Sequence, residues 1–80
     1  MFEKDMAMSV LLDYYGDLLG EHRRGIIELY YNEDYSLSEI SEISGISRQG
    51  VRDSIKKSEN ELRKFEACLH LVRRNSVFNE

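Results

Sequence analysis

The chain has a single cysteine, Cys68, and this scarcity sets the first limits on its chemistry. One cysteine excludes an internal disulfide and a metal site built from several cysteines. The lack of a disulfide framework fits a reducing compartment. We expect Cys68 to behave as a small hydrophobic side chain, buried or half-buried.

Long hydrophobic runs are also missing. No apolar stretch approaches the roughly 20 residues that a bilayer-spanning helix needs. The N-terminus lacks the basic segment followed by an apolar segment that marks a secretory signal. The sequence therefore predicts a cytoplasmic protein with no membrane partner.

Signs of catalysis are equally scarce. His22 and His70 lie far apart in the sequence, and no glycine-rich phosphate loop is present. The acidic residues stand mainly where helix starts and solvated faces would place them. Because an enzyme needs an activated nucleophile or a convergent acid–base set, we predict a non-enzymatic protein with no catalytic residue, cofactor or metal ion.

What the chain does contain is the pattern of a helix-turn-helix at about residues 36–57. Ser36 followed three residues later by Glu39 is a capping box, so a helix is predicted to begin just after Ser36. Gly45 supplies the left-handed residue that ends this helix. Ser47 is the N-cap of a second helix. Two helices joined by about three or four residues form the unit whose second helix enters the major groove of DNA.

The apolar residues of this segment support the same interpretation. Leu37, Ile40 and Ile43 recur at helical spacing, and Ser41 is small enough to let a second helix cross closely. Ile46 stands between the two helix ends, so we expect its side chain to fill the corner.

The second helix has two unlike faces. Val51 and Ile55 lie four residues apart on one face, whereas the opposite face carries polar side chains. Arginine and glutamine match the donors and acceptors of base edges, and lysine suits phosphate as a point charge. The predicted base-edge contacts are Arg48, Gln49 and Arg52, and the predicted phosphate contacts are Ser47, Lys56 and Lys57. For a lone basic helix a solvated surface would be the better interpretation, but the helix-turn-helix pattern favours nucleic acid.

The charge balance weighs against DNA binding. The chain is net negative, with a formal charge of −4, whereas DNA-binding domains commonly have a high pI. Residues 47–57, however, hold four basic side chains against Asp53 alone, so this segment carries +3 and the rest of the chain −7. We therefore expect double-stranded DNA to be bound weakly, and with strong salt dependence, unless dimerisation doubles the basic surface.

Two further helices are predicted before this unit. Met6, Val10, Tyr14 and Leu18 repeat every four residues, and Met8, Leu11 and Leu12 widen the stripe. A helix from about Asp5 to Tyr15, ended by Gly16-Asp17, should turn this stripe inward. The next helix should span Glu21 to Tyr31. The five tyrosines could serve as base-stacking platforms, but their helical core spacing favours buried rings with the hydroxyls at the rim.

A heptad-like seam continues out of the second helix of the pair. Its members follow one another at steps of four and three, which is the spacing of a coiled-coil face: Val51, Ile55, Ser58, Leu62, Phe65, Leu69 and Val72. One long helix is therefore predicted over about residues 48–74, roughly 40 Å in length.

Part of this seam is a candidate dimer contact. An 80-residue chain is a single domain, residues 1–80, that buries only about 60% of its unfolded surface. We expect it to form a homodimer through Leu62, Phe65, Leu69 and Val72. The alternative is that these side chains pack back on the first helix of the same chain.

From Leu11 to about Leu69 the sequence resembles the YlxM family of small bacterial helix-turn-helix proteins, which are similar to region 4 of sigma-70 factors. The matching stretches are Leu11–Tyr15, Ile27–Tyr31, Glu33–Ile40 and Ile46–Gln49, with Val51, Asp53 and Ile55. The resemblance implies an all-α, sigma-70 region 4-like fold with a long C-terminal helix. Such proteins are associated with the signal recognition particle pathway and described as DNA-binding regulators of it, so components of the particle are implied partners.

Three departures from the family pattern stand out. Gly50 replaces the usual alanine, and a glycine inside a helix costs about 0.5–1 kcal/mol relative to alanine. Arg52 stands where the family carries an aromatic residue, which adds charge and favours nucleic acid. The chain also stops earlier than members of the family, so we expect a C-terminal helix of the family to be missing from it.

Two functions from different classes follow. The first is a dimeric DNA-binding regulator. The second is a non-enzymatic adaptor that keeps the fold but binds a protein or the RNA of the signal recognition particle. The charged outward face of the second helix favours the regulator, whereas the acidic body and Gly50 favour the adaptor.

Overall fold

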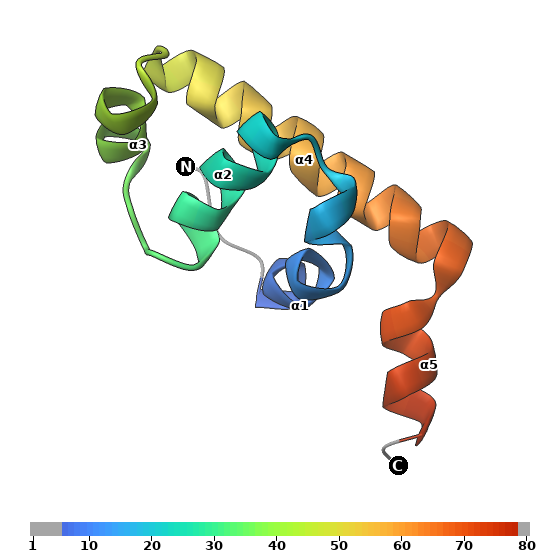
Figure 1. Cartoon of the computed structure of the whole chain (residues 1–80). Coiled ribbons are helices and arrows are strands. Elements are labelled where there is room, and N and C mark those ends of the chain that lie inside the picture. The colour runs from blue at the N-terminus through green and yellow to red at the C-terminus, as the bar shows by residue number, and fades with distance from the viewer. Residues whose placement is uncertain (1–5, 79–80) are drawn as a thin grey trace.

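The computed structural model describes residues 6–78, which are helical apart from short connections. This confirms the all-α prediction. Figure 1 shows the longest helix running across the whole molecule, with the N-terminal helices on one side of it and a last short helix turning away at its end. The elements are α1 (Met6–Tyr15), a 3-10 turn η1 (Gly16–Leu18), α2 (Glu21–Tyr31), α3 (Leu37–Ser44), α4 (Arg48–Leu69) and α5 (Leu71–Phe78).

The local signals of the helix-turn-helix act as predicted. The Ser36 hydroxyl accepts from the Glu39 backbone N–H at 3.1 Å, while the Glu39 carboxylate accepts from the Ser36 N–H at 2.8 Å. Gly45 ends α3 with a φ of 79°, in the left-handed region that favours glycine. Ser47 then caps α4 by accepting from the Gly50 N–H at 3.0 Å. The predicted starts of both helices are therefore confirmed.

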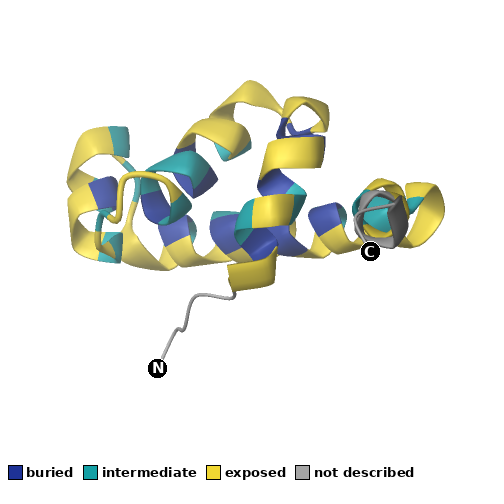
Figure 2. Ribbon diagram, turned by 90° about the horizontal axis from the view of Figure 1, so that it is seen from below, coloured by how far each residue is buried: buried dark blue, intermediate teal, exposed yellow. Residues whose placement is uncertain are grey.

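The core consists of two apolar clusters that share α4 as a common wall. One cluster lies under the turn between α3 and α4, and the other lies between α1, α2 and the middle of α4; Figure 2 shows the buried residues gathered along this wall. The first contains Ile26, Tyr30, Ile40, Val51 and Ile55. The second contains Met8, Leu12, Tyr15, Leu19, Ile27 and Leu62.

Polar ties between α2 and α4 supplement this packing. The Arg23 guanidinium lies 2.9 Å from one carboxylate oxygen of Glu61 and 3.0 Å from the other. The Tyr31 hydroxyl donates to the carboxylate of Glu59, a buried residue, at 2.5 Å. Both contacts hold the side of α4 that faces α2.

The predicted inward face of α1 is confirmed for Met8, Leu11 and Leu12 but wrong for the four-residue repeat. Met6, Val10, Tyr14 and Leu18 are 78%, 41%, 40% and 57% exposed, whereas Met8, Leu12, Tyr15 and Leu19 are buried. Residues that follow one another at steps of four, like the exposed set, drift by about 40° per step around a helix of 3.6 residues per turn. Residues at steps of four, three and four, like the buried set, stay on one side of the helix. The predicted start of this helix, Asp5, lies outside the described residues. On α3, Ile43 is likewise exposed, and only Ile40 is fully buried.

The long helix predicted over residues 48–74 is confirmed as far as Leu69, but its last part is wrong. Helix α4 ends at Leu69, His70 takes a left-handed conformation with a φ of 56°, and α5 begins at Leu71. The first backbone N–H groups of α5 donate hydrogen bonds to side chains. The N–H of Leu71 donates to the Tyr15 hydroxyl at 3.0 Å, and those of Val72 and Arg73 donate to the Glu66 carboxylate at 3.2 and 3.1 Å. The Tyr15 hydroxyl in turn donates to Glu66 at 2.5 Å.

The seam residues lie mostly inside the single chain. Leu62 is completely buried, and Phe65 and Val72 pack against the α1 cluster, which is the intramolecular alternative. Leu69 is exposed, so of the four predicted dimer contacts it alone faces outward; self-association stays a prediction. Cys68 is exposed, and the expectation that it is buried is wrong.

Glu66 gives the α4–α5 corner a pH dependence that can be tested. The hydrogen bond from Tyr15 is the main cause that lowers the pKa of Glu66 below its usual 4.5. This stabilisation is complete above pH 4.5 and is lost as the pH falls through the lower folded pKa. Glu66→Gln should lower the melting temperature at neutral pH, speed amide exchange in α5 and flatten the acid-induced loss of stability. Thermal melts from neutral to strongly acidic pH measure this. The exposed Glu42→Gln serves as the control, and parallel curves for Glu66→Gln and the wild type would contradict this role of Glu66.

Gly50 offers a second test. A Cβ at Gly50 would meet the Ser47 hydroxyl at 3.3 Å, whereas a Cβ at Gly25 in α2 would meet nothing within 4 Å. We expect Gly50→Ala to raise the free energy of unfolding by about 0.5 kcal/mol and Gly25→Ala by about 1 kcal/mol, because alanine loses less backbone entropy in a helix. Denaturant unfolding would measure both. If Gly50→Ala lowers the free energy of unfolding while Gly25→Ala raises it, the Ser47 hydroxyl cannot shift to make room for the added Cβ.

Candidate nucleic-acid interface

The interface is built on the first three turns of α4. Val51 and Ile55 are completely buried, which fixes the rotation of the helix about its axis. All six predicted contact residues are solvent-exposed, as is Asp53: Ser47, Arg48, Gln49, Arg52, Lys56 and Lys57. Ser47 lies just before α4 as its N-cap, and the other five belong to the first three turns of the helix.

The turn sets the angle between α3 and α4. The Ser41 hydroxyl donates to the Ile46 carbonyl at 2.5 Å, so the small residue on α3 is tied to the turn itself. The Ile46 side chain packs against the cluster that contains Ile40 and Val51, as predicted for a residue that fills the corner. Helix α4 is therefore held by apolar packing on one side and by a hydrogen bond across the turn.

Arg48 connects the two helices at their N-terminal ends. Its guanidinium donates to the Ser38 hydroxyl at 3.3 Å, which links the first turn of α4 to the first turn of α3. A hollow of about 240 Å³ lies at this junction, lined by Leu37, Arg48, Gln49 and Arg52. Ser38 and Leu37 were not among the predicted site residues. Their position inside the capping box, in the first turn of α3, was the available signal.

Gln49 is paired with Asp53 one turn further along. The Gln49 amide nitrogen donates to a carboxylate oxygen of Asp53 at 3.0 Å. A carboxylate can only accept, so the nitrogen of the amide faces Asp53 and the amide oxygen remains available to another donor. Gln49 therefore presents its amide oxygen and the second N–H of its amide to the surroundings.

Acidic side chains border the interface on the α3 side. A hollow of about 330 Å³ is lined by Tyr35, Glu39, Glu42 and Ile43, with Glu39 engaged in the capping box. The four basic residues from Arg48 to Lys57 are thus a positive strip beside a negative one. A strip of this kind can accept a phosphate backbone along one line and disfavours it on the α3 side.

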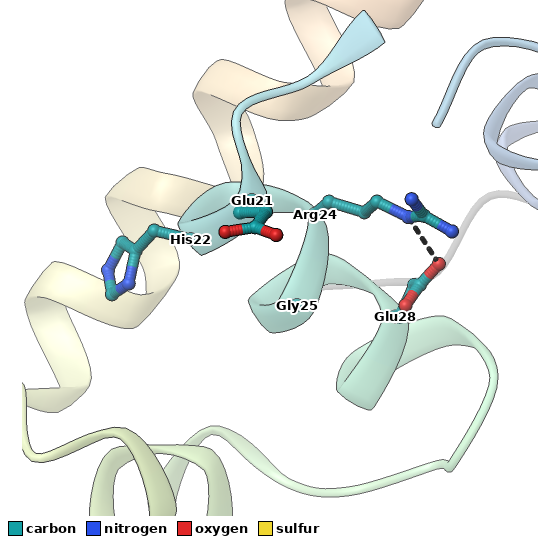
Figure 3. Close-up of a pocket in the computed structure, with 5 residues that line it drawn as sticks. All are labelled: Glu21, His22, Arg24, Gly25 and Glu28. Atoms are coloured by element: carbon teal, nitrogen blue, oxygen red, sulfur yellow. Dashed lines mark hydrogen bonds and ion pairs between the residues drawn. The ribbon is translucent and has the colours of Figure 1, made fainter. Parts of the chain in front are cut away.

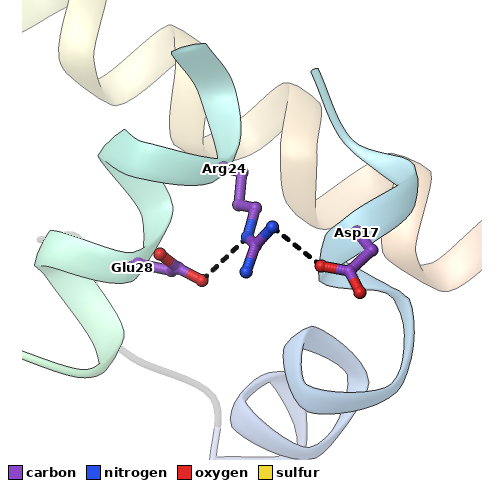
Figure 4. A network of polar contacts seen from close by, with 3 residues as sticks. All are labelled: Asp17, Arg24 and Glu28. Atoms are coloured by element: carbon purple, nitrogen blue, oxygen red, sulfur yellow. Dashed lines mark hydrogen bonds and ion pairs between the residues drawn. The ribbon is translucent and has the colours of Figure 1, made fainter. Parts of the chain in front are cut away.

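A larger hollow of about 540 Å³ lies on α2, where Glu21, His22, Arg24, Gly25 and Glu28 line it. Figure 3 shows that His22 points away from Arg24 and Glu28, so these side chains do not converge on one point. Arg24 instead donates to Glu28 at 3.0 Å and lies 2.7 Å from Asp17, an arrangement that Figure 4 shows in full. The hollow is a surface depression beside an ion-pair network.

The described part of the chain, residues 6–78, offers neither a metal site nor a membrane span. Within it no three histidine, cysteine or acidic residues are grouped so that they could hold a metal ion. None of its helices combines the length and the apolar character needed to cross a membrane.

Comparison with known proteins identifies the family. A family profile described as "Putative helix-turn-helix protein, YlxM / p13 like" (UPF0122) matches residues 2–80. A UPF0122 protein of Thermoanaerobacter sp. (strain X514) is 53% identical over 70 residues, covering 88% of this chain and 60% of the relative. A UPF0122 protein of Streptococcus agalactiae serotype III is 43% identical over 82 residues, covering 98% of this chain and 74% of the relative. Although it spans only about 60% of the length of the first relative, the chain belongs to the UPF0122 family of YlxM-like helix-turn-helix proteins.

Proposed function

We propose that this protein is a DNA-binding regulator that reads duplex DNA through the outward face of α4. The observation that carries the proposal is the exposed cluster of Arg48, Gln49 and Arg52 at the start of the second helix of a helix-turn-helix. In this motif the N-terminal residues of the second helix reach base edges. Lys56 and Lys57, one to two turns further on, would contact phosphates.

Proposals on the location, the oligomeric state and the pathway of the protein follow from DNA binding. A regulator of this kind works in the cytoplasm, and a homodimer would double a basic strip that holds only four positive residues. The resemblance to the YlxM family supports a role in the signal recognition particle pathway. The second candidate, an adaptor that binds a protein or RNA component of the particle, is favoured by the −7 charge of the chain outside residues 47–57, because an acidic body repels duplex DNA.

Selection from a pool of random duplexes separates the two candidates. We expect the wild type to enrich a short motif at physiological salt. Arg52→Ala should relax the preference at one base position, at a cost of about 1–3 kcal/mol for the preferred base. Lys64→Ala, exposed on the second half of α4, is the matched control and should leave the motif unchanged. The absence of any enriched motif, beside a stable complex with a particle component, would favour the adaptor.

The two lysines should act in a different way. Replacing both Lys56 and Lys57 by alanine should weaken binding to all duplexes alike, because phosphate contacts carry no sequence information. The slope of log affinity against log salt should become shallower by about 0.9 for each phosphate that is no longer neutralised. Salt titrations of one selected duplex would measure this slope. A changed motif with an unchanged slope would show that the lysines read bases.

Asp53 should determine what Gln49 recognises. The hydrogen bond to Asp53 uses one N–H of the Gln49 amide and fixes the orientation of that amide, whose oxygen can accept from the exocyclic amino group of adenine or of cytosine. Asp53→Ala should release the amide to turn into the orientation that makes two hydrogen bonds to adenine, and should shift the selected motif towards adenine at that position. Asp53→Asn is the control, since it keeps an acceptor for Gln49: it should raise affinity by removing a negative charge and leave the preference unchanged. The same motif for all three proteins would refute this role.

A further inference from the structure

Helix α1 has the composition of a buried helix but lies at the surface. Asp13 is its only charged residue, and one side of it already packs into the core through Met8, Leu12 and Tyr15. The opposite side begins the exposed stripe, defined as Met6, Val10 and Tyr14 of α1 with Leu18 of the following turn η1. A helix that is apolar all round is normally buried on all sides. The stripe is therefore a surface that the described residues, 6–78, leave uncovered.

We propose that a second copy of this chain covers the stripe, so that the protein dimerises by packing α1 against α1 of its partner. The stripe runs in steps of four residues, which is the ridge that packs into the matching ridge of another helix in the most frequent crossing geometry. A contact of this kind uses the same surface on both copies and closes on itself as a twofold dimer.

The area of the stripe agrees with a dimer of modest affinity. Its four side chains leave roughly 400 Å² of apolar surface exposed, comparable with the largest patch on a typical monomer. Two copies with their flanking residues would bury about 1,000 Å², which is near the lower limit for a specific interface. We therefore expect an equilibrium between monomer and dimer rather than an obligate dimer.

The charge beside the stripe favours a second copy over a strongly basic partner. Asp17, at the end of the stripe, lies 2.7 Å from Arg24, which also pairs with Glu28, so the three side chains together carry a single negative charge (Figure 4). Asp13 is the one other carboxylate that α1 contributes. A surface with so little net charge offers a basic segment little electrostatic gain, whereas two copies can approach it without strong repulsion.

The proposal moves the dimer contact away from the C-terminal seam. Leu62 and Val72 are used inside the chain, so the seam offers only Leu69 outward, with Leu71 exposed beside it. Two exposed leucines at a corner give less apolar surface than the four side chains of the stripe on α1 and η1. The contact also does not depend on DNA, so it can be tested in the absence of any duplex.

Sedimentation velocity from micromolar to millimolar concentration tests the proposal, with a reductant present because the exposed Cys68 could otherwise form a disulfide between copies. The wild type should show a reversible monomer–dimer equilibrium. Val10→Glu should raise the dissociation constant at least about tenfold, because it places a charge in an apolar contact. Leu69→Glu on the seam and Ile43→Glu on α3 are matched controls, both exposed leucine or isoleucine positions, and should leave the equilibrium unchanged.

A mixing experiment identifies the partner as a second copy. Val10→Glu and Val10→Lys should each dimerise poorly, and their equimolar mixture should dimerise at least about fivefold more tightly, because opposite charges then face each other near the centre of the stripe. Circular dichroism checks that each variant is folded, and Leu18→Glu replaces Val10→Glu if it is not. A wild type that stays monomeric throughout, or a dimer dissociated by Leu69→Glu and not by Val10→Glu, would overturn the proposal.

Discussion

The structure depends on one constraint, which is that α4 serves two purposes with one continuous helix of 22 residues. Its inner side passes through both apolar clusters, where Val51, Ile55 and Leu62 are completely buried. Any rotation of α4 about its axis would expose all three at once. The same rotation would turn the basic residues away from solvent. Core packing therefore fixes the direction of the outward face, and no special contact among the outward side chains is needed to do so.

The end of α4 is set by contacts from the opposite end of the sequence. Tyr15 comes from the N-terminal helix, yet its hydroxyl bonds to Glu66 and accepts the first N–H of α5. Burial is the main reason that the pKa of the Tyr15 hydroxyl is raised, and its hydrogen bond to Glu66 raises it further, so the phenol stays protonated and able to donate. The corner between α4 and α5 is thus a tertiary feature that ties α1 to the C-terminal part of the chain.

The packing of α4 and the corner between α4 and α5 explain which features could be predicted from the sequence and which could not. The caps of α3 and α4 involve residues three positions apart, and such local signals predicted both helix starts, Gly45 and the outward face correctly. The end of α4 at Leu69 depends on Tyr15 and Glu66, which are 51 positions apart, and no local pattern in the sequence predicts it. The two sides of α1 are both apolar, so periodicity alone could not select the one that packs. The hydrogen bond between Arg48 and Ser38 depends on how α3 and α4 cross, which the sequence does not specify.

The proposed function requires that DNA contacts the start of α4. Nitrogen–proton correlation spectra recorded during titration with a short selected duplex test this most directly, because every backbone amide except that of the first residue reports separately. We expect shifts concentrated within residues 36–57, strongest around Arg48, Gln49 and Arg52, with α1 and α5 little changed. Shifts confined to α1, α2 or α5, or no shifts with any duplex, would show that α4 does not read DNA.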